Sequence, residues 1–173
     1  MKRAATILIL LFIFATESLG QDIQTNFLGL KIGEEYHFDT QTDIAGYPFE
    51  KDGENDYLGL NIRFGGYDWD FTWIQLSPIK RKFHQIVFQS YFNDERSARE
   101  MTNRLHEQLS IKYGDKASGE EFLWHDKNDM FCSLNLSYQE SKSGKLYWYV
   151  TLVYWSSIHA GIFEKYIQGL VEL

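Results

Sequence analysis

Two short acidic segments come closest to a metal-binding pattern. Residues 52–56 read Asp-Gly-Glu-Asn-Asp, and residues 126–129 read Asp-Lys-Asn-Asp. An EF-hand calcium loop spans about twelve residues, places oxygen ligands at fixed positions and ends on a glutamate, and neither segment has that spacing. We therefore expect ordinary turns at both places, and we predict no metal ion and no other cofactor.

A third acidic pattern is the Asp68-x-Asp70 pair, which could support metal binding or acid–base chemistry. Folding the chain back about Gly65-Gly66 sets Arg63 opposite Asp68 and Asn61 opposite Asp70. A cross-strand ion pair on a solvated face accounts for this arrangement. The sequence favours that structural role over a catalytic one.

Imidazole and thiol side chains form no catalytic signature. The five histidines are scattered, with no two at the spacing of metal ligands. Cys132 alternates with apolar residues, so we expect a packed and unreactive thiol. The chain has no Gly-x-Ser-x-Gly motif, phosphate loop or dinucleotide fingerprint. Catalysis has no support in the sequence, although residues from distant elements can still assemble a site.

The most informative pattern is a hairpin of two alternating strands, residues 130–138 and 146–154. One row of its side chains is apolar and should face the core. The opposite row interleaves aromatic residues with Ser, Thr and Asn, a composition typical of recognition surfaces. The candidate binding residues are Phe131, Asn135, Tyr147, Tyr149, Thr151 and Trp155. The alternative is that a C-terminal helix or residues 21–55 cover this row.

An earlier hairpin turns at Gly65-Gly66 and continues into a third strand over residues 83–92. Leu58, Leu60, Phe71 and Trp73 are paired by this turn, and we expect all four on the apolar face. Pairing Trp73 with Ile86 would extend that face onto the third strand.

Two helices are expected to cover the apolar face. The first follows N-cap candidates at Asn93 and Asp94, ends before Gly114 and repeats apolar residues every three or four positions. The second begins near Ser157 and runs toward the C-terminus. The predicted fold is α+β: an antiparallel meander sheet of about six strands, packed by a central helix and a C-terminal helix.

Residues 1–20 have the order of a secretory signal peptide. Lys2 and Arg3 precede an uncharged apolar run, and Ser18-Leu19-Gly20 supplies small residues before Gln21. The apolar run is too short to span a bilayer, which takes roughly 20 residues. We expect cleavage near Gly20-Gln21 and export of one soluble domain, residues 21–173, to the periplasm or the medium. Residues 21–55 are its least regular part.

Charge and cysteine content restrict the partners of the exported domain. The whole chain has a net charge of −7, and removing a leader that holds Lys2, Arg3 and Glu17 makes it −8. Such an acidic domain does not suit nucleic acid or an anionic membrane surface. A single cysteine cannot form an intramolecular disulfide, so burial must stabilise the fold. This favours a bacterial envelope protein.

From residue 83 onward, the elements occur in an order known from other proteins. A helix ending in Lys112-Tyr113-Gly114 is followed by Trp124 and by strands reading Leu134-x-Leu136-x-Tyr138 and Val150-x-Leu152-x-Tyr154. The run from Phe27 to Gly33 also resembles the start of such proteins, although the helix that normally follows it is not evident here. The chain thus resembles a broad group of small exported bacterial proteins, similar in fold to the β-lactamase-inhibitor protein and to small outer-membrane assembly factors. This resemblance implies a sheet covered by helices that serves as a binding surface, and it carries over no functional residue.

Taken together, these features predict a non-enzymatic exported domain that binds another protein through its polar-aromatic sheet face. It would act as an inhibitor, an immunity factor or an envelope-assembly component. A small envelope enzyme such as a hydrolase is one alternative. A module that binds a glycan or a small ligand through stacked rings is another.

Overall fold

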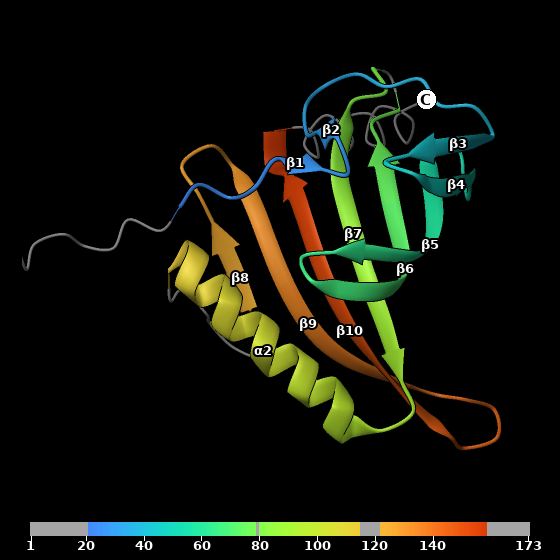
Figure 1. Ribbon diagram of the computed structural model, residues 1–173, viewed down its shortest axis with the longest axis vertical. Helices are drawn as coiled ribbons and strands as arrows, with labels where there is room; N and C mark the ends of the chain where they lie inside the picture. Colours follow the sequence, from blue (N-terminus) through green and yellow to red (C-terminus); the bar gives the residue numbers. More distant parts are fainter. Residues whose placement is uncertain (1–20, 79, 115–121, 159–173) are drawn as a thin grey trace, which may run out of the picture.

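The computed structural model describes residues 21–78, 80–114 and 122–158. These residues form an eight-stranded antiparallel sheet, a separate two-stranded hairpin and one long helix (Figure 1). The α+β class and the antiparallel sheet are therefore confirmed. The elements are β1 (Asn26–Phe27), β2 (Leu30–Lys31), β3 (Gln41–Ile44), β4 (Tyr47–Lys51), β5 (Asp56–Phe64), β6 (Tyr67–Leu76), β7 (Phe83–Phe92), α2 (Glu95–Tyr113), β8 (Phe122–His125), β9 (Met130–Glu140) and β10 (Leu146–Ser156).

The prediction of a six-stranded meander is wrong in its strand number and in its order. The strands lie in the order β3-β4-β5-β6-β7-β10-β9-β8. After β7 the chain passes through α2 and re-enters the sheet at the far edge as β8. It then returns through β9 and β10, which pairs with β7. The additional strands β3 and β4 come from the region that the sequence left irregular.

Helix α2 follows its sequence signals closely. The Asp94 carboxylate caps the first turn by accepting a hydrogen bond from the Ser97 amide at 2.9 Å. At the other end Gly114 has φ +87°, and its amide bonds to the Ser110 carbonyl. The buried stripe runs from Ala98 to Tyr113 and packs on β7, β9 and β10. The central helix is confirmed.

The inner face of the sheet is the side that α2 covers. Along β10 it carries Val150, Leu152 and Tyr154, which are all buried. The β1–β2 hairpin covers the same side, where the Phe27 ring lies 4.7 Å from the Tyr154 ring. Burial between these layers forms the core.

The β5–β6 hairpin bends at Asn61, whose φ is +54°. Side chains normally alternate across a strand, but Gly59 and Ile62 are both buried although they lie three residues apart. Partner strand β6 repeats this break between Trp69 and Thr72. The hairpin tip, residues 62–69, consequently folds over the inner face and crosses in front of β6 and β7 in Figure 1.

Aromatic stacking holds the hairpin tip against the sheet. The Phe64 ring stacks on the Phe88 ring of β7 at 4.4 Å, and the Trp69 ring lies 5.5 Å from the same ring. The Trp69 indole also donates a hydrogen bond to the Phe64 carbonyl at 3.1 Å. The tip and α2 therefore cover adjacent parts of one face.

Because of this bend, the expectation that Leu58, Leu60, Phe71 and Trp73 lie on the apolar face is wrong. The predicted β5–β6 register is confirmed, with Leu58 opposite Trp73 and Leu60 opposite Phe71. All four residues nevertheless lie on the face away from α2. In β5, the even-numbered side chains face away from α2 before Asn61 and toward it after Asn61, so the apolar residues of the tip and these four lie on opposite faces. Trp73 consequently pairs with Val87 and not with Ile86.

Two predicted segments fall outside the described residues. The predicted signal peptide, residues 1–20, lies there, as does the predicted C-terminal helix apart from its first two residues, 157 and 158, which are helical. Within the described part of the chain, no helix combines the length and apolar character needed to cross a membrane.

Candidate functional site

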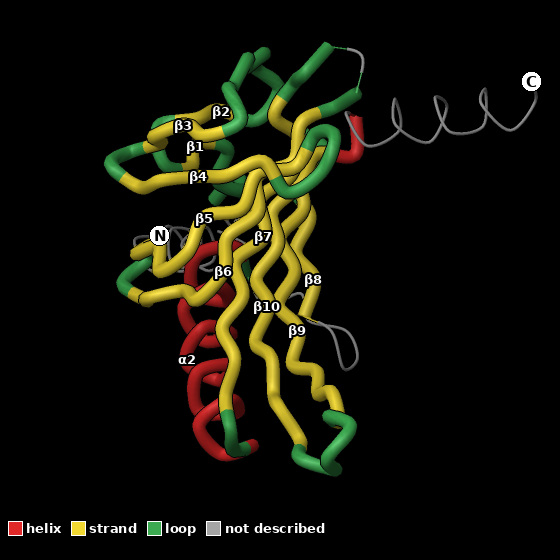
Figure 2. Tube along the Cα trace, turned by 90° about the vertical axis from the view of Figure 1, so that its right-hand side faces the viewer, coloured by secondary structure: helices red, strands yellow, loops and turns green. Residues whose placement is uncertain are grey.

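The face of the sheet opposite α2 is the candidate site. Figure 2 shows the sheet nearly edge-on, with α2 and the hairpin tip on one side. On the other side, the described part of the chain has only the short helical segment 157–158, at one end of the sheet. We call this side the outer face. It comprises the odd-numbered residues within 71–75, 85–91, 123–125, 131–139 and 147–155, together with Leu58 and Leu60 of β5, and all of these are partly or fully exposed.

All six sequence-predicted binding residues lie on the outer face. The cross-strand register sets Phe131 opposite Trp155 and Asn135 opposite Thr151, while Tyr149 and Tyr147 follow along β10. The observed pairing differs by two residues from the one expected, with Tyr138 opposite Trp148 instead of Leu146. A shift of two residues preserves the face of every side chain, so the predicted surface survives it.

Stacked rings occupy the end of the outer face nearest β8. The Phe131 and Trp155 rings are nearly parallel at 12°, with centroids 5.0 Å apart. The His125 ring stacks on the other side of Phe131 at 4.3 Å. These rings pack against one another like a ladder, so much of each ring face is taken by its neighbour.

Polar side chains occupy the middle of the face. The Gln89 amide donates a hydrogen bond to the Thr151 hydroxyl at 3.1 Å, across β7 and β10. At the far end, the Lys145 ammonium lies 4.8 Å from the centre of the Tyr147 ring. These contacts hold the predicted residues in defined positions on a flat support.

The bend at Asn61 adds a second aromatic group that sequence reasoning missed. The Phe71 and Trp73 rings stack at 5.7 Å, and the Trp73 indole donates to the Asp52 carboxylate at 3.1 Å. Together with Tyr149 they border a shallow hollow of about 630 Å³. An asparagine in mid-strand was the available signal, because Asn tolerates positive φ better than most residues.

None of the outer-face positions given above is Lys, Arg, Asp or Glu, although charged residues make up 24% of the chain. Carboxylates border the face at several places. The Asp129 carboxylate lies 3.6 Å from the His125 imidazole. The Asp70 carboxylate accepts a hydrogen bond from the Tyr91 amide at 3.0 Å.

Asp52 and Asp56 lie at the β5 edge of the outer face. Asp56, opposite Gln75, faces the same side. Burial, reinforced by the Asp52 charge, raises the pKa of Asp56 above its usual value.

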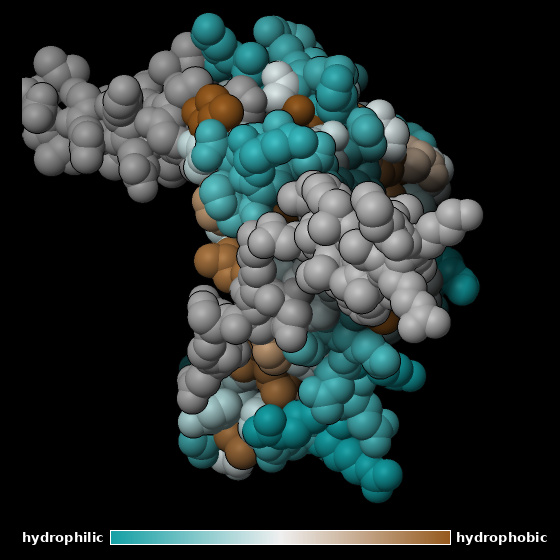
Figure 3. All heavy atoms as spheres, turned by 90° about the vertical axis from the view of Figure 1, so that its left-hand side faces the viewer, coloured by the Kyte–Doolittle hydropathy of each residue, from teal (hydrophilic) through white to brown (hydrophobic). Residues whose placement is uncertain are grey.

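The solvent side of α2 has the opposite character. Arg96 pairs with Glu100 at 2.9 Å, and Arg99 pairs with Glu95 at 2.6 Å. Figure 3, which looks at the edge formed by α2 and β8, shows mostly hydrophilic side chains among the described residues there. Elsewhere Arg63 and Asp68 approach to 3.9 Å, which confirms the predicted cross-strand pair.

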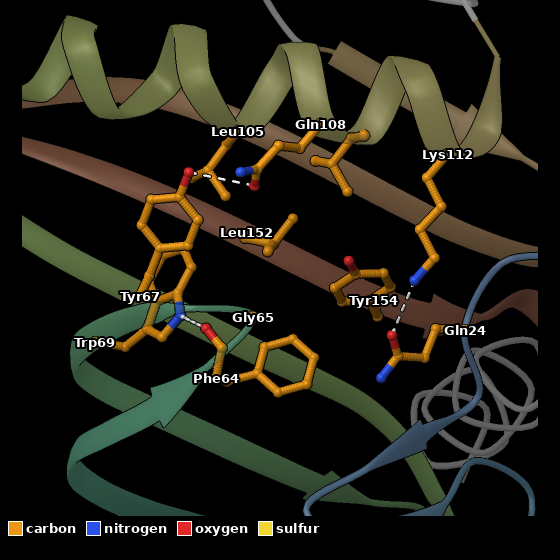
Figure 4. A pocket seen from close by; sticks show the side chains of 11 residues that line it. Gln24, Phe64, Gly65, Tyr67, Trp69, Leu105, Gln108, Lys112, Leu152 and Tyr154 are labelled. Carbon is orange, nitrogen blue, oxygen red and sulfur yellow. Dashed lines mark hydrogen bonds between the residues drawn. The ribbon is translucent and has the colours of Figure 1, made fainter.

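A second hollow lies on the inner side, in the seam between α2 and the hairpin tip (Figure 4). We call it the seam pocket. It encloses about 170 Å³. Its walls include Phe64 and Trp69 from the tip, Leu105 and Lys112 from α2, and Leu152 from the sheet.

The strongly shifted titratable groups are buried on the inner face. Burial raises the pKa of the Cys132 thiol to about 12, and it also raises the pKa of Tyr154 well above its usual value. Cys132 has no exposed surface, in agreement with the expectation of a packed thiol. Among the described residues, no three His, Cys, Asp or Glu side chains gather to hold a metal ion.

Comparisons with protein-family models, with characterised proteins and with solved structures found no match to this chain. The resemblance to exported inhibitors and assembly factors therefore stays a hypothesis. The case for function depends on the geometry of the outer face.

Proposed function

We propose that this chain is a non-enzymatic domain that binds another protein through its outer face. The observation that carries the proposal is a broad sheet surface that is rich in Trp, Tyr and Phe and lacks Lys, Arg, Asp and Glu. Depletion of charge and enrichment in aromatic residues mark the centres of protein interfaces.

The dimensions of the outer face suit a protein partner. Residues advance about 3.3 Å along a strand, so the span from Tyr147 to Trp155 is roughly 26 Å. The six strands contribute segments of different length, which together hold 36 residues of about 3.3 Å by 4.8 Å each. The resulting area of roughly 570 Å² approaches the roughly 800 Å² that each partner contributes to a standard interface.

The orientation of the rings favours a protein over a glycan. A sugar stacks on an open ring face, whereas Phe131 lies between Trp155 and His125. The neighbouring hydroxyl and amide groups of Thr151 and Gln89 can pair with polar groups at the rim of a protein partner. Anchor rings beside adaptable polar groups are common in protein recognition.

The cellular setting belongs to the same proposal. We infer that residues 1–20 are removed, and that the domain acts in the periplasm or the medium as an inhibitor, an immunity factor or an envelope-assembly component. The mass of the protein recovered from its producing cell tests the export step. A mature chain beginning at Gln21 is expected, and a cytoplasmic protein that retains residues 1–20 would contradict it.

Binding is tested with an outer-face variant and a matched control. A partner is first captured with the wild-type domain and purified, and its affinity is then measured by calorimetry. Because interface anchors commonly contribute 2 kcal/mol or more, Trp155→Ala combined with Tyr149→Ala should weaken binding by at least about 30-fold. The control is Ile111→Ala, which removes an 80% exposed apolar side chain from α2.

The control variant should bind like the wild type, and circular dichroism should show that both variants are folded. Equal affinity of the wild-type and outer-face variants would overturn the proposal. An equal loss in the Ile111→Ala variant would place the interface on the helix instead.

A further inference from the structure

The seam pocket lies where α2 and the hairpin tip cover adjacent parts of the inner face of the sheet. Helix α2 covers the inner face above β9 and β10, and the hairpin tip covers it above β6 and β7. Between them Leu152 and Tyr154 of β10 form the floor, as Figure 4 shows. Each cover is held by its own contacts with the sheet, and the two are joined directly by the Tyr67 hydroxyl, which donates to the Gln108 side chain at 3.2 Å.

The interior of the pocket is apolar and partly aromatic. Phe64 and Trp69 line one wall, and Leu105 and Leu109 line the other. Its volume of about 170 Å³ is close to that of the roughly 150 Å³ apolar cavity that accommodates benzene. One six-membered ring therefore fits, and aromatic walls favour an aromatic ring through offset or edge contacts.

A positively charged side chain, that of Lys112, lies at one end of the apolar pocket. The Lys112 ammonium donates to the Gln24 side-chain oxygen at 3.2 Å and lies 5.1 Å from the centre of the Tyr113 ring. Among the described residues, no carboxylate comes within salt-bridge distance of Lys112. An ammonium has three donors, so Lys112 keeps capacity for an anionic partner.

We propose that the seam pocket binds a small monocyclic aromatic carboxylate. The ring lies between the aromatic wall of the tip and the leucines of α2. The carboxylate pairs with Lys112 and takes the place of the Gln24 amide. This site is independent of the outer face, since it lies on the opposite side of the sheet.

The probe for this site is phenylacetate, with phenylacetamide as its uncharged counterpart. Binding to the full chain is followed by NMR, using the Trp69 indole N–H resonance as a reporter inside the pocket. A saturable shift is expected with a Kd on the order of 1 mM or tighter, given the size of the ligand. Phenylacetamide should bind at least about tenfold more weakly, because it cannot form an ion pair with Lys112.

Two variants and a control separate charge from shape. Lys112→Met keeps the length of the side chain and should reduce phenylacetate binding about tenfold, while binding of phenylacetamide stays unchanged. Leu105→Phe should fill the pocket and abolish binding of both probes. Lys142→Met, in the exposed β9–β10 turn, should change neither.

The proposal is overturned if neither probe moves the Trp69 resonance of the folded wild-type protein, or if phenylacetamide binds as well as the acid. The comparison of the two probes needs no substitution, so it remains decisive even if a variant fails to fold. Tyr149→Ala with Trp155→Ala should leave phenylacetate binding intact. Failure of this proposal is therefore distinct from failure of protein binding at the outer face.

Discussion

The two faces of the central sheet share the same strands and differ in what covers them. Along β10, Val150, Leu152 and Tyr154 point inward and are buried, whereas Thr151 and Trp155 point outward and remain partly exposed. Helix α2, the hairpin tip and β1–β2 all lie on the inner side (Figure 1). The outer side carries comparable aromatic residues with no cover among the described elements.

This difference separates stability from recognition. Inner-face rings are removed from water during folding and supply the hydrophobic free energy that stabilises the domain. Outer-face rings stay partly hydrated, so their burial remains possible when another molecule binds. Substitutions on the two faces should therefore have different consequences even where residue type and strand are the same.

The largest contrast is expected in thiol reactivity along β9. Cys132 is fully buried and its pKa is about 12, against an ordinary value of 9.0, so its thiolate fraction falls roughly a thousandfold. A Ser133→Cys substitution in a Cys132→Ala background moves the thiol one residue onward, to the outer face. Iodoacetamide at pH 8 should label the variant at least about 1000-fold faster than the folded wild type. Comparable rates would mean that the two faces are not distinguished as described.

The next contrast concerns two tryptophans of β6. Trp69 is 1% exposed on the inner side, whereas Trp73 is half-buried on the outer face. Trp69→Ala should lower the free energy of unfolding by about 3–5 kcal/mol through lost packing. Trp73→Ala should lower it by about 1 kcal/mol, as at an ordinary partly exposed site. Urea titration measures both values, and equal losses would count against an uncovered outer face.

A smaller loss in the free energy of unfolding is expected when the residue at the β5 bend, Asn61, is replaced. Asn61 adopts φ +54°, which costs a β-branched residue about 1–2 kcal/mol. Asn61→Val should therefore lower the free energy of unfolding by about that amount, while Asn61→Gly should leave it nearly unchanged. If both variants matched the wild type in thermal unfolding, the bend would not depend on residue 61.

The smallest effect concerns the carboxyl group at the edge of the outer face. Burial, followed by the Asp52 charge, raises the pKa of Asp56, so the folded state holds the proton more tightly than the unfolded state. The associated stability is present below the unfolded pKa and is lost as pH rises through the folded pKa. Asp56→Asn should thus raise Tm slightly at pH 7. At pH 3 the Tm values of the two proteins should converge, and a lower Tm of the variant at pH 7 would contradict the direction of the shift.

The elements with strong local signals could be predicted from the sequence. Strict alternation from Met130 to Tyr138 determined which β9 side chains face outward, and the N-cap at Asp94 located the start of α2. Even a pairing error of two residues left each of these side chains on the expected face of the sheet. The confirmed parts are those in which local periodicity and tertiary burial agree.

The remaining parts depend on tertiary contacts that periodicity does not encode. Phe49 of β4 packs over Gly59, where an added Cβ would lie 2.7 Å from the ring. Strand β4 itself contains only five residues, one of them Pro48, so its own sequence gives little indication of a strand. The placement of β8 at the far edge depends on pairing with β9. The aromatic pair Phe71 and Trp73 was assigned to the wrong face because one residue, Asn61, reverses the alternation.

The most direct test of the outer face uses a photo-cross-linking residue in the producing cell. Benzoylphenylalanine is placed at Thr151, in the centre of the outer face, and in a second variant at Glu107, on the solvent side of α2. If the outer face binds a protein, a discrete cross-linked product should form from position 151 and be absent from position 107. It should also disappear when Tyr149→Ala and Trp155→Ala are added. Cross-linking from position 107 alone, or from neither position, would contradict protein binding at the outer face.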